Sequence, residues 1–410
     1  MGIDQSVLDI LKSLYYYVVN MIVRHLDQAL AQHFEKYKEV LVLLGARQVG
    51  KTTIVKKIFP QADYLVVDNE PIKNALERYD PAVYKQLLNA NSDFVVVDEI
   101  HKLSDPGRAA KIFFDQLPQY KLIITGSSAF NIKNKSSESL AGRKIDYHLY
   151  PLSLSEYLVQ NGLENALSLL PMQKLVAGEK AERVFKQYDH REILNNILIY
   201  GLYPAMQSHP SDSVYLTNLI DSVVFKDLVE LSLLENKSAA LSLLKLLAHQ
   251  IGSLVNYAEL ASKLGISART VKRYIELFEQ SFIIFTVKPY STRKRDEIAK
   301  MPKVFFYDLG LRNALINNFE HVDTRGDAGQ LFENFIVSEL LKYNYYGNFG
   351  YSFNYWRTKS GSEIDLVLSR FGHKTIAVEI KSQQQRINQA FLSRYPESRM
   401  VVISRDNYWV

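Results

Sequence analysis

The sequence predicts an α/β protein, and three observations lead to that prediction. Short all-apolar runs at 40–44, 94–97 and 122–124 have the composition of buried parallel strands. A glycine-rich loop follows the first run, and residues 52–59 then have helical spacing that stops at Pro60. Strand, loop and helix in this order are typical of a parallel sheet covered by helices.

The loop after the first strand matches the phosphate-binding pattern G-x-x-x-x-G-K-[ST] in full. Its backbone N–H groups and the helix N-terminus would face the phosphates of a nucleotide. Lys51 would reach the outer phosphates, and Thr52 would offer its hydroxyl to Mg²⁺. We therefore expect ATP and Mg²⁺ as ligands. The predicted nucleotide-binding residues of this loop are Gly45, Ala46, Arg47, Gln48, Val49, Gly50, Lys51, Thr52 and Thr53.

Acidic and polar residues follow the other two strands. Asp98 would hold Mg²⁺ through water beside the loop, and Glu99 would polarise the attacking water. The alternative is a pair of solvated acids at a strand end. The third strand runs into Thr125 and Ser127, and Ser127 would either contact the γ-phosphate or cap the next helix.

Four segments, in the order GARQVGKTT, VVVDEIHK, ITGSSA and LAGRKIDYHLYPLSLSEYL, resemble the AAA-type ATPases that prokaryotes carry fused to a C-terminal domain of unknown function. The resemblance extends from Lys38 to the end of the chain. It implies Arg143 as an arginine finger or sensor, acting in its own site or in that of a second copy. A surface arginine in an ion pair is the other interpretation, and both stay open. Assembly into a homo-oligomer stays open as well.

Composition narrows the class of protein. A chain of 410 residues is too long for one core, and 47% hydrophobic with 23% charged residues is ordinary for folded domains. The absence of cysteine excludes disulfides, thiol chemistry and cysteine-based zinc sites. No run approaches the ~20 apolar residues of a membrane span, so we expect a cytoplasmic protein without a membrane partner. The net charge of +5 permits a nucleic-acid partner without requiring one.

Changes of pattern along the chain predict five segments. An apolar run at 14–19 would form an amphipathic helix that docks on the ATPase core. The segments are an N-terminal helical segment at 1–37, a P-loop ATPase core at 38–152, a helical lid at 153–240, a winged helix-turn-helix at 241–302 and a smaller α/β domain at 303–410.

The fourth segment has the pattern of a helix-turn-helix. Residues 256–265 predict a helix closed by a C-terminal glycine, and residues 268–280 predict a second helix with Ser267 as its N-cap. Residues 282–287 would form the first strand of a wing. Basic residues on the helix and at the wing suit contact with DNA, whereas docking to protein is the alternative. The predicted DNA-binding residues are Arg269, Lys272, Arg273, Arg293 and Lys294.

The last segment contains a second group of acidic residues. Residues 329–341 predict an amphipathic helix with Glu333 near its start, and 361–368 and 375–381 predict strands. An acidic helix, an acidic strand and an E-x-K strand together resemble the PD-(D/E)xK nuclease fold, in the form found at the end of this ATPase family. Glu333 would then be a metal ligand or would hold a metal-bound water.

Strand alternation arranges the other residues of this group. It places Ile364 and Leu366 on one face with Asp365 on the other, and aligns Glu379 with Lys381. Asp365 and Glu379 would bind one Mg²⁺ or Mn²⁺. Lys381 would orient a water or stabilise developing charge.

The predicted fold class is α/β: a P-loop ATPase with a parallel sheet, a helical lid, a winged helix and a restriction-endonuclease-like C-terminal domain. We expect a Mg²⁺-dependent ATPase that binds DNA and carries a nuclease-like module gated by ATP. The alternative is an ATP-binding regulatory or docking switch without nuclease activity. The predicted catalytic residues are Glu99, Arg143, Glu333 and Lys381.

Overall fold

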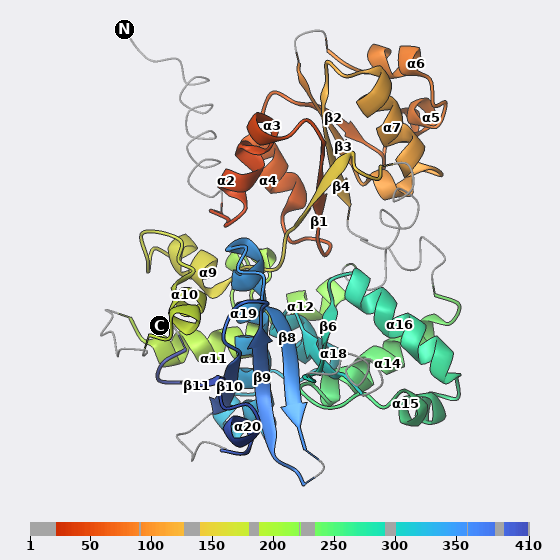
Figure 1. Cartoon of the computed structure of the whole chain (residues 1–410). Coiled ribbons are helices and arrows are strands. Elements are labelled where there is room, and N and C mark those ends of the chain that lie inside the picture. Colours follow the sequence, from red (N-terminus) through yellow and green to blue (C-terminus); the bar gives the residue numbers. More distant parts are fainter. Residues whose placement is uncertain are drawn as a thin grey trace, which may run out of the picture.

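Two sheets organise the chain, one in each of two bodies (Figure 1). The computed structural model describes residues 22–89, 92–126, 140–179, 188–220, 222, 234–291, 301–358, 360–381 and 389–408. The predicted docking helix at 14–19 lies outside these residues. In the described part of the chain, no helix has the length and apolar character that crossing a membrane requires.

The sheet of the upper body is parallel throughout, with the order β2-β3-β4-β1-β5. Its strands are β1 Val40–Leu44, β2 Asp63–Val66, β3 Phe94–Asp98, β4 Lys121–Gly126 and β5 Lys144–His148. The three apolar runs form its centre, as predicted from their composition. The edge strands β2 and β5 were not predicted, because their polar residues leave neither with the apolar run of a central strand.

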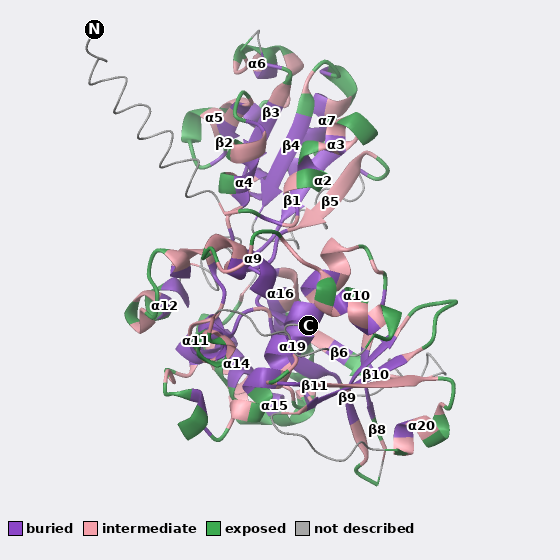
Figure 2. Cartoon of the chain, turned by 90° about the vertical axis from the view of Figure 1, so that its left-hand side faces the viewer, coloured by how far each residue is buried: buried purple, intermediate pink, exposed green. Residues whose placement is uncertain are grey.

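Short helices surround this sheet. They are α2 Asp27–Ala31, α3 His33–Lys36, α4 Lys51–Ile58, α5 Glu70–Leu76, α6 Pro81–Gln86, the 3₁₀ turn η1 Ile100–Lys102 and α7 Pro106–Gln116. The start of α7 shows why they begin where they do: Asp105 accepts the N–H of Arg108 at 2.9 Å, and Pro106 occupies the first helical position. The central strands β1, β3 and β4 consist almost entirely of buried residues (Figure 2).

The segment predicted as a lid is helical and lies in the lower body (Figure 1). Its elements are α9 Leu154–Gln160, α10 Leu170–Ala177, α11 His190–Tyr200, η2 Pro204–Gln207 and α12 Ser213–Ile220. A capping box between Ser153 and Glu156 starts α9. Helices α10, α11 and α12 pack against α18 Leu309–Leu315 and α19 Ala328–Tyr346.

The predicted helix-turn-helix follows α14 Lys237–His249. It consists of α15 Tyr257–Leu264, which ends at Gly265 with φ +64°, and α16 Ala268–Gln280. Ser267 caps α16 by accepting the N–H of Thr270 at 3.0 Å, as predicted.

The strand predicted as part of a wing belongs to a larger sheet. β6 Ile284–Pro289 pairs antiparallel with β7 Lys303–Phe306 and parallel with β8 Ser352–Arg357. The six-stranded order is β11-β10-β9-β8-β6-β7. Its remaining strands are β9 Glu363–Ser369, β10 Ile376–Lys381 and β11 Arg399–Ser404.

Two helices cover this mixed sheet. The long helix α19 is buried along most of its length, and residues of β9 and β10 join it in the main core. The short helix α20 Ala390–Arg394 packs elsewhere, and its Phe391 forms a second core cluster with Trp356, Ile364, Val367 and Ala377. The 3₁₀ turn η4 Val322–Thr324 precedes α19.

One expectation for β9 is wrong. Leu366 lies in the main core, whereas Ile364 lies in the second cluster, so the two residues do not share a face. The pairing of β8 with β9 changes register between Asn354 and Trp356, because an extra residue on β9 interrupts the regular alternation. Strict period-two alternation therefore does not extend from Glu363 to Leu366.

Candidate nucleotide site

The loop between β1 and α4 requires glycine at both positions that the phosphate-binding pattern specifies. Gly50 has φ +95°, a backbone conformation that strains other residues. A Cβ on Gly45 would lie 2.2 Å from the carbonyl oxygen of Leu149, so no side chain fits there. The start of the loop therefore packs closely against the backbone of Leu149, which follows β5.

The site brings together the predicted phosphate and Mg²⁺ residues. Lys51 is 5% exposed, and its Nζ donates to the carbonyl oxygens of Gly45 at 3.0 Å and Ala46 at 2.8 Å. Its ammonium therefore lies inside the curve of the loop, where backbone N–H groups and the start of α4 attract anions. Thr52 Oγ1 donates to Asp98 Oδ2 at 3.1 Å, so a hydroxyl oxygen of α4 and a carboxylate oxygen of β3 lie side by side. Hydroxyl and carboxylate oxygens of this kind suit Mg²⁺.

Thr125, at the end of β4, completes the arrangement. Its hydroxyl donates to Asp98 and accepts the backbone N–H of Glu99 at 3.2 Å. The sequence prediction placed Ser127 in the site, and that residue lies outside the described part of the chain. Thr125 could have been chosen instead, because it lies at the carboxyl end of a strand between β1 and β3, where ligands of parallel sheets bind.

Glu99 has an unusual backbone conformation. Its φ of +59° is uncommon for a residue other than glycine, and such conformations cluster at functional sites. Glu99 Oε2 lies 3.4 Å from Nε2 of the buried His101. Nearby on β2, burial together with the negative charge of Asp98 raises the pKa of Tyr64.

The remaining loop residues differ in exposure. Arg47 is half-buried, Gln48 and Thr53 are exposed, and Ala46 and Val49 are fully buried. Gln48 Nε2 donates to Ser222 Oγ at 3.1 Å, which ties the loop to the lower body.

Arg143 lies at the other end of the sheet. It directly precedes β5, and its carbonyl oxygen accepts the N–H of Val40 at the start of β1. The phosphate loop begins after Leu44, roughly 13 Å away along the strand. Arg143 Nε pairs with Asp115 at 3.1 Å, with both side chains about one-third exposed. The structure therefore does not bring Arg143 to the phosphate loop of its own chain.

Arg24 is a site residue that sequence analysis missed. It is 4% exposed and lies behind the loop, where Nη1 donates to the carbonyl oxygen of Val49 at 2.9 Å. Nη2 donates to the carbonyl oxygen of Tyr150 at 2.6 Å, and Nε lies 3.1 Å from Glu156. No motif surrounds Arg24 in the sequence, because its partners are distant along the chain.

The acidic residues of the C-terminal segment meet a lysine. Lys303 Nζ lies 3.1 Å from Glu333 on α19 and 2.6 Å from Glu363 on β9. Arg357 lies 3.6 Å from the second oxygen of Glu363. Buried charges are tolerated when they are paired, and here the side chain of Lys303, which is 5% exposed, supplies the cation.

Asp365 and Glu379 lie on neighbouring antiparallel strands. Asp365 Oδ2 accepts the N–H of Ile380 at 2.7 Å, and burial raises the pKa of Asp365. Glu379 is 2% exposed, and Lys381 is half-buried at the end of β10. Within the described ranges, no three acidic or histidine side chains have an arrangement that could hold a metal ion.

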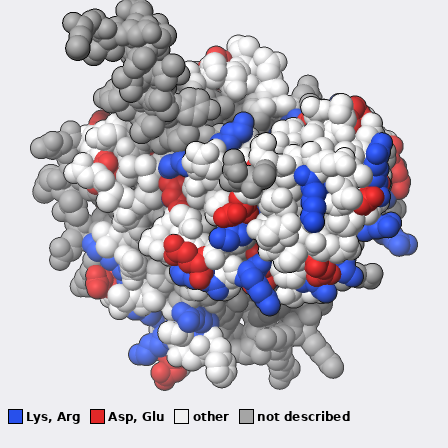
Figure 3. Space-filling view, turned by 90° about the horizontal axis from the view of Figure 1, so that it is seen from above, with Lys and Arg blue, Asp and Glu red and all other residues white. Residues whose placement is uncertain are grey.

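The basic residues of α16 lie at the surface. Arg269, Lys272 and Arg273 are exposed, while Tyr274 and Phe278 of the same helix are buried. Arg273 pairs with Glu235 at 2.5 Å, and Lys272 lies 3.8 Å from Glu276. Arg293 and Lys294 lie outside the described part of the chain. On the face shown in Figure 3, basic and acidic side chains are intermixed.

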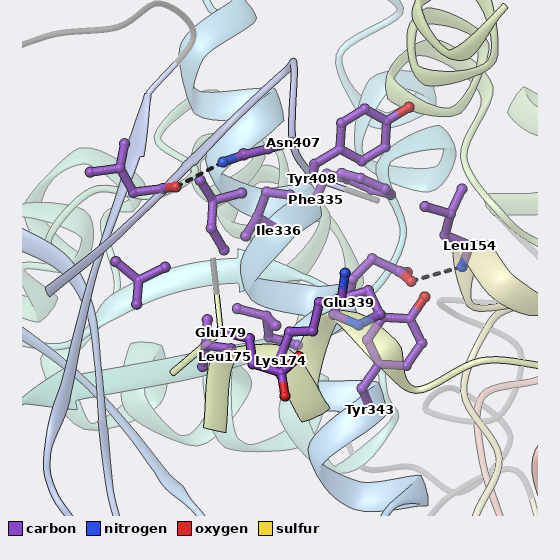
Figure 4. Close-up of a pocket in the computed structure, with 15 residues that line it drawn as sticks. Leu154, Lys174, Leu175, Glu179, Phe335, Ile336, Glu339, Tyr343, Asn407 and Tyr408 are labelled. Carbon is purple, nitrogen blue, oxygen red and sulfur yellow. Dashed lines mark hydrogen bonds between the residues drawn. The ribbon is translucent and has the colours of Figure 1, made fainter. Parts of the chain in front are cut away.

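A separate pocket lies between α10, α19 and β11 (Figure 4). Its volume is about 50 Å³, against the roughly 300 Å³ at which small-molecule sites begin. Its lining is largely apolar, with Phe335 and Ile336 on one side. At its edge, Glu339 accepts the N–H of Leu154 at 2.7 Å. The pocket is therefore a packing gap beside an interdomain contact and not a nucleotide site.

The loop geometry agrees with a family match. Residues 37–158 match the family model of the AAA domain, and they form an AAA-type, P-loop ATPase-like domain with a parallel sheet. Residues 191–322 and 328–407 match two domains of unknown function, DUF8612 and DUF4143.

The chain also has relatives along most of its length. It is 24% identical over 390 residues to an uncharacterized protein of Methanocaldococcus jannaschii, covering 89% of this chain and 80% of that one. It is 24% identical over 370 residues to an uncharacterized protein of Mycobacterium tuberculosis, covering 88% and 74%. A Walker-type ATPase of Pyrococcus abyssi is similar in structure, with a TM-score of 0.42, 13% identity and coverage of 71% of this chain and 94% of that one.

Proposed function

We propose that this chain binds ATP with Mg²⁺, hydrolyses it and works as a nucleotide-dependent switch. The main support is the position of three side chains at one edge of the parallel sheet: Lys51, Thr52 and Asp98. Thr52 and Asp98 lie 3.1 Å apart although 46 residues separate them. A phosphate loop next to such an oxygen pair is the arrangement that phosphoryl-transfer ATPases use.

The side chains have distinct roles in this proposal. Loop N–H groups and the start of α4 bind the phosphates, and the Lys51 ammonium exchanges its carbonyl partners for phosphate oxygens. Thr52 and Asp98 would hold Mg²⁺, which neutralises charge on the phosphates when it is bound. The Glu99 carboxylate, beside His101, orients the attacking water.

A switch agrees better with the C-terminal domain than a metal-dependent nuclease does. Nuclease chemistry would need Asp365 and Glu379 to coordinate a divalent cation, with Glu333 as a further ligand or as the holder of a metal-bound water. In the structure, the Lys303 ammonium already bridges Glu333 and Glu363. Glu333 therefore already faces a cation, and within the described residues no three acidic or histidine side chains are arranged to hold a metal ion.

We further propose that α16 contacts DNA. Its exposed Arg269, Lys272 and Arg273 lie on a helix whose opposite face is buried in the core. The ion pairs to Glu235 and Glu276 are exposed, and such pairs exchange readily for phosphate contacts because they contribute little free energy.

Two assays test the proposed function. The purified chain should bind and hydrolyse ATP only with Mg²⁺, and Lys51→Ala should abolish binding, while Lys36→Ala, at an exposed lysine on α3, should not. Plasmid DNA incubated with the chain and Mg²⁺ or Mn²⁺, with and without ATP, should stay intact. If the wild-type chain nicks the plasmid and Asp365→Ala does not, the chain is a nuclease and the proposed switch without nuclease activity is wrong.

A further inference from the structure

The segment from His148, the last residue of β5, to Ser155, in the first turn of α9, lies directly against the phosphate loop. The N–H of Leu149 donates to the carbonyl oxygen of Leu44, the last residue before the loop, at 2.7 Å. The carbonyl oxygen of Leu149 occupies the space that a side chain on Gly45 would need. Any shift of this segment would therefore move the first residue of the loop.

The other side of the same segment is held by α19, the central helix of the C-terminal domain. Side chains from its last two turns bind the segment through backbone groups, which fixes its register and not only its position. Five bonds do so: Tyr345 accepts from His148 (2.8 Å), Tyr346 from Tyr150 (3.2 Å), Glu339 from Leu154 (2.7 Å) and Tyr343 from Ser155 (3.3 Å), while Lys342 donates to Leu152 (2.8 Å).

Arg24 joins this contact to the back of the loop. One guanidinium binds the carbonyl oxygens of Val49 in the loop and Tyr150 in the segment, and pairs with Glu156 at the start of α9. The Glu156 side chain is fully buried and also accepts the N–H of His25 at 2.8 Å. The ring of His25 stacks on Tyr346 of α19 at 5.1 Å.

This arrangement is more specific than stability alone requires. Burying a guanidinium and a carboxylate costs free energy, and replacing such a pair with apolar residues is often neutral or stabilising. A buried network of this kind instead favours one geometry, because partial loss leaves charges unpaired. Here the fixed geometry is that of the loop relative to α19.

We propose that the C-terminal domain sets the conformation of the phosphate loop through α19, with Arg24 and Tyr346 as positioning residues. The inference rests on the proposed ATP binding and adds its regulation. A partner or ligand that displaces α19 changes the affinity for ATP, and ATP changes the affinity for that partner by the same factor.

Removing the hydroxyl of Tyr346 tests whether α19 sets the conformation of the phosphate loop. Tyr346→Phe deletes the group that accepts the N–H of Tyr150 and leaves Lys51, Thr52 and Asp98 untouched. We expect the Kd and KM for MgATP to rise about two- to tenfold, the effect of one lost hydrogen bond, while kcat at saturating ATP stays within about twofold. Arg24→Lys should raise the same Kd further.

The matched control is Tyr84→Phe. Tyr84 is buried and its hydroxyl also bonds a backbone group, donating to the carbonyl oxygen of Leu76 at 2.6 Å, but it lies on α6. It should lower thermal stability without changing the Kd. Equal Kd values for wild type and Tyr346→Phe would overturn the inference, even if Arg24→Lys fails to fold. Wild-type protein that binds no ATP would instead overturn the proposed function.

Discussion

The ammonium group of Lys303, on β7, lies 3.1 Å from the carboxylate of Glu333, on α19. The same ammonium also faces Glu363, so one largely buried cation serves two carboxylates. Burial raises the pKa of Glu333 to about 7, with Lys303 opposing the rise and Asp365 adding to it. Glu333 therefore keeps its proton at pH values where an exposed glutamate has lost it.

The pH dependence of stability follows from this relationship. Between about pH 4.5 and 7 the unfolded chain releases the proton that folded Glu333 retains, so the free energy of unfolding falls as pH rises. Glu333→Gln should show a shallower fall. Urea unfolding at pH 5 and pH 8 compares the two proteins, and parallel pH profiles would contradict the raised pKa of Glu333.

Asp327 should behave in the opposite sense. Burial alone would raise its pKa, but hydrogen bonds from Arg325 and Arg312 lower the pKa of Asp327 to about 2. Its contribution is present above about pH 4 and is lost as pH falls toward 2. Asp327→Asn should cost about 3 kcal/mol at pH 7, because two buried arginines lose their common anion. Unfolding at pH 7 and pH 3 should show the difference between the proteins shrinking at the lower pH.

DNA affinity should depend on α16. Replacing Arg269, Lys272 and Arg273 with alanine should weaken binding to duplex DNA and flatten its salt dependence, since each lost phosphate contact removes about 0.9 from the slope. The matched control removes three exposed lysines of the ATPase domain, Lys36, Lys85 and Lys111, and so changes the net charge equally. If both triple variants weaken DNA binding equally, the affinity depends on the net charge of the protein and not on a specific contact with α16.

Arg143 lies at the end of β1 away from the loop, so an action on bound ATP would require a second copy. ATP hydrolysis by dilute, monomeric Arg143→Ala should therefore equal that of wild type. If a second copy uses Arg143, the wild-type rate per chain rises with protein concentration and the variant rate does not. Loss of turnover in the dilute variant would contradict the placement of Arg143.

Structural features that depend only on neighbouring residues in the chain could be predicted from the sequence. The phosphate loop is one such feature. Its two glycines are required by the backbone, because Gly50 has a positive φ and Gly45 lies too close to the backbone of Leu149 for a side chain. The end of α15 and the start of α16 are others, since Gly265 and Ser267 bond to backbone groups within four residues.

Features that depend on distant contacts could not be predicted. Arg24 binds carbonyl groups 25 and 126 residues away, and no local pattern marks such a residue. Lys303, placed at a domain boundary by sequence, meets Glu333 only when β7 joins the second sheet. The extra residue in β9 moves Leu366 to the other face without any sequence signal such as glycine or proline.

Trapping of ATP by Glu99→Gln tests the central claim most directly. Gln keeps the size of the side chain but cannot accept the proton of the attacking water, while Thr52 and Asp98 still hold Mg²⁺. We expect Glu99→Gln to bind MgATP with wild-type affinity and to hydrolyse it at least about a hundredfold more slowly. Equal hydrolysis rates for wild type and Glu99→Gln would contradict the assignment of this site.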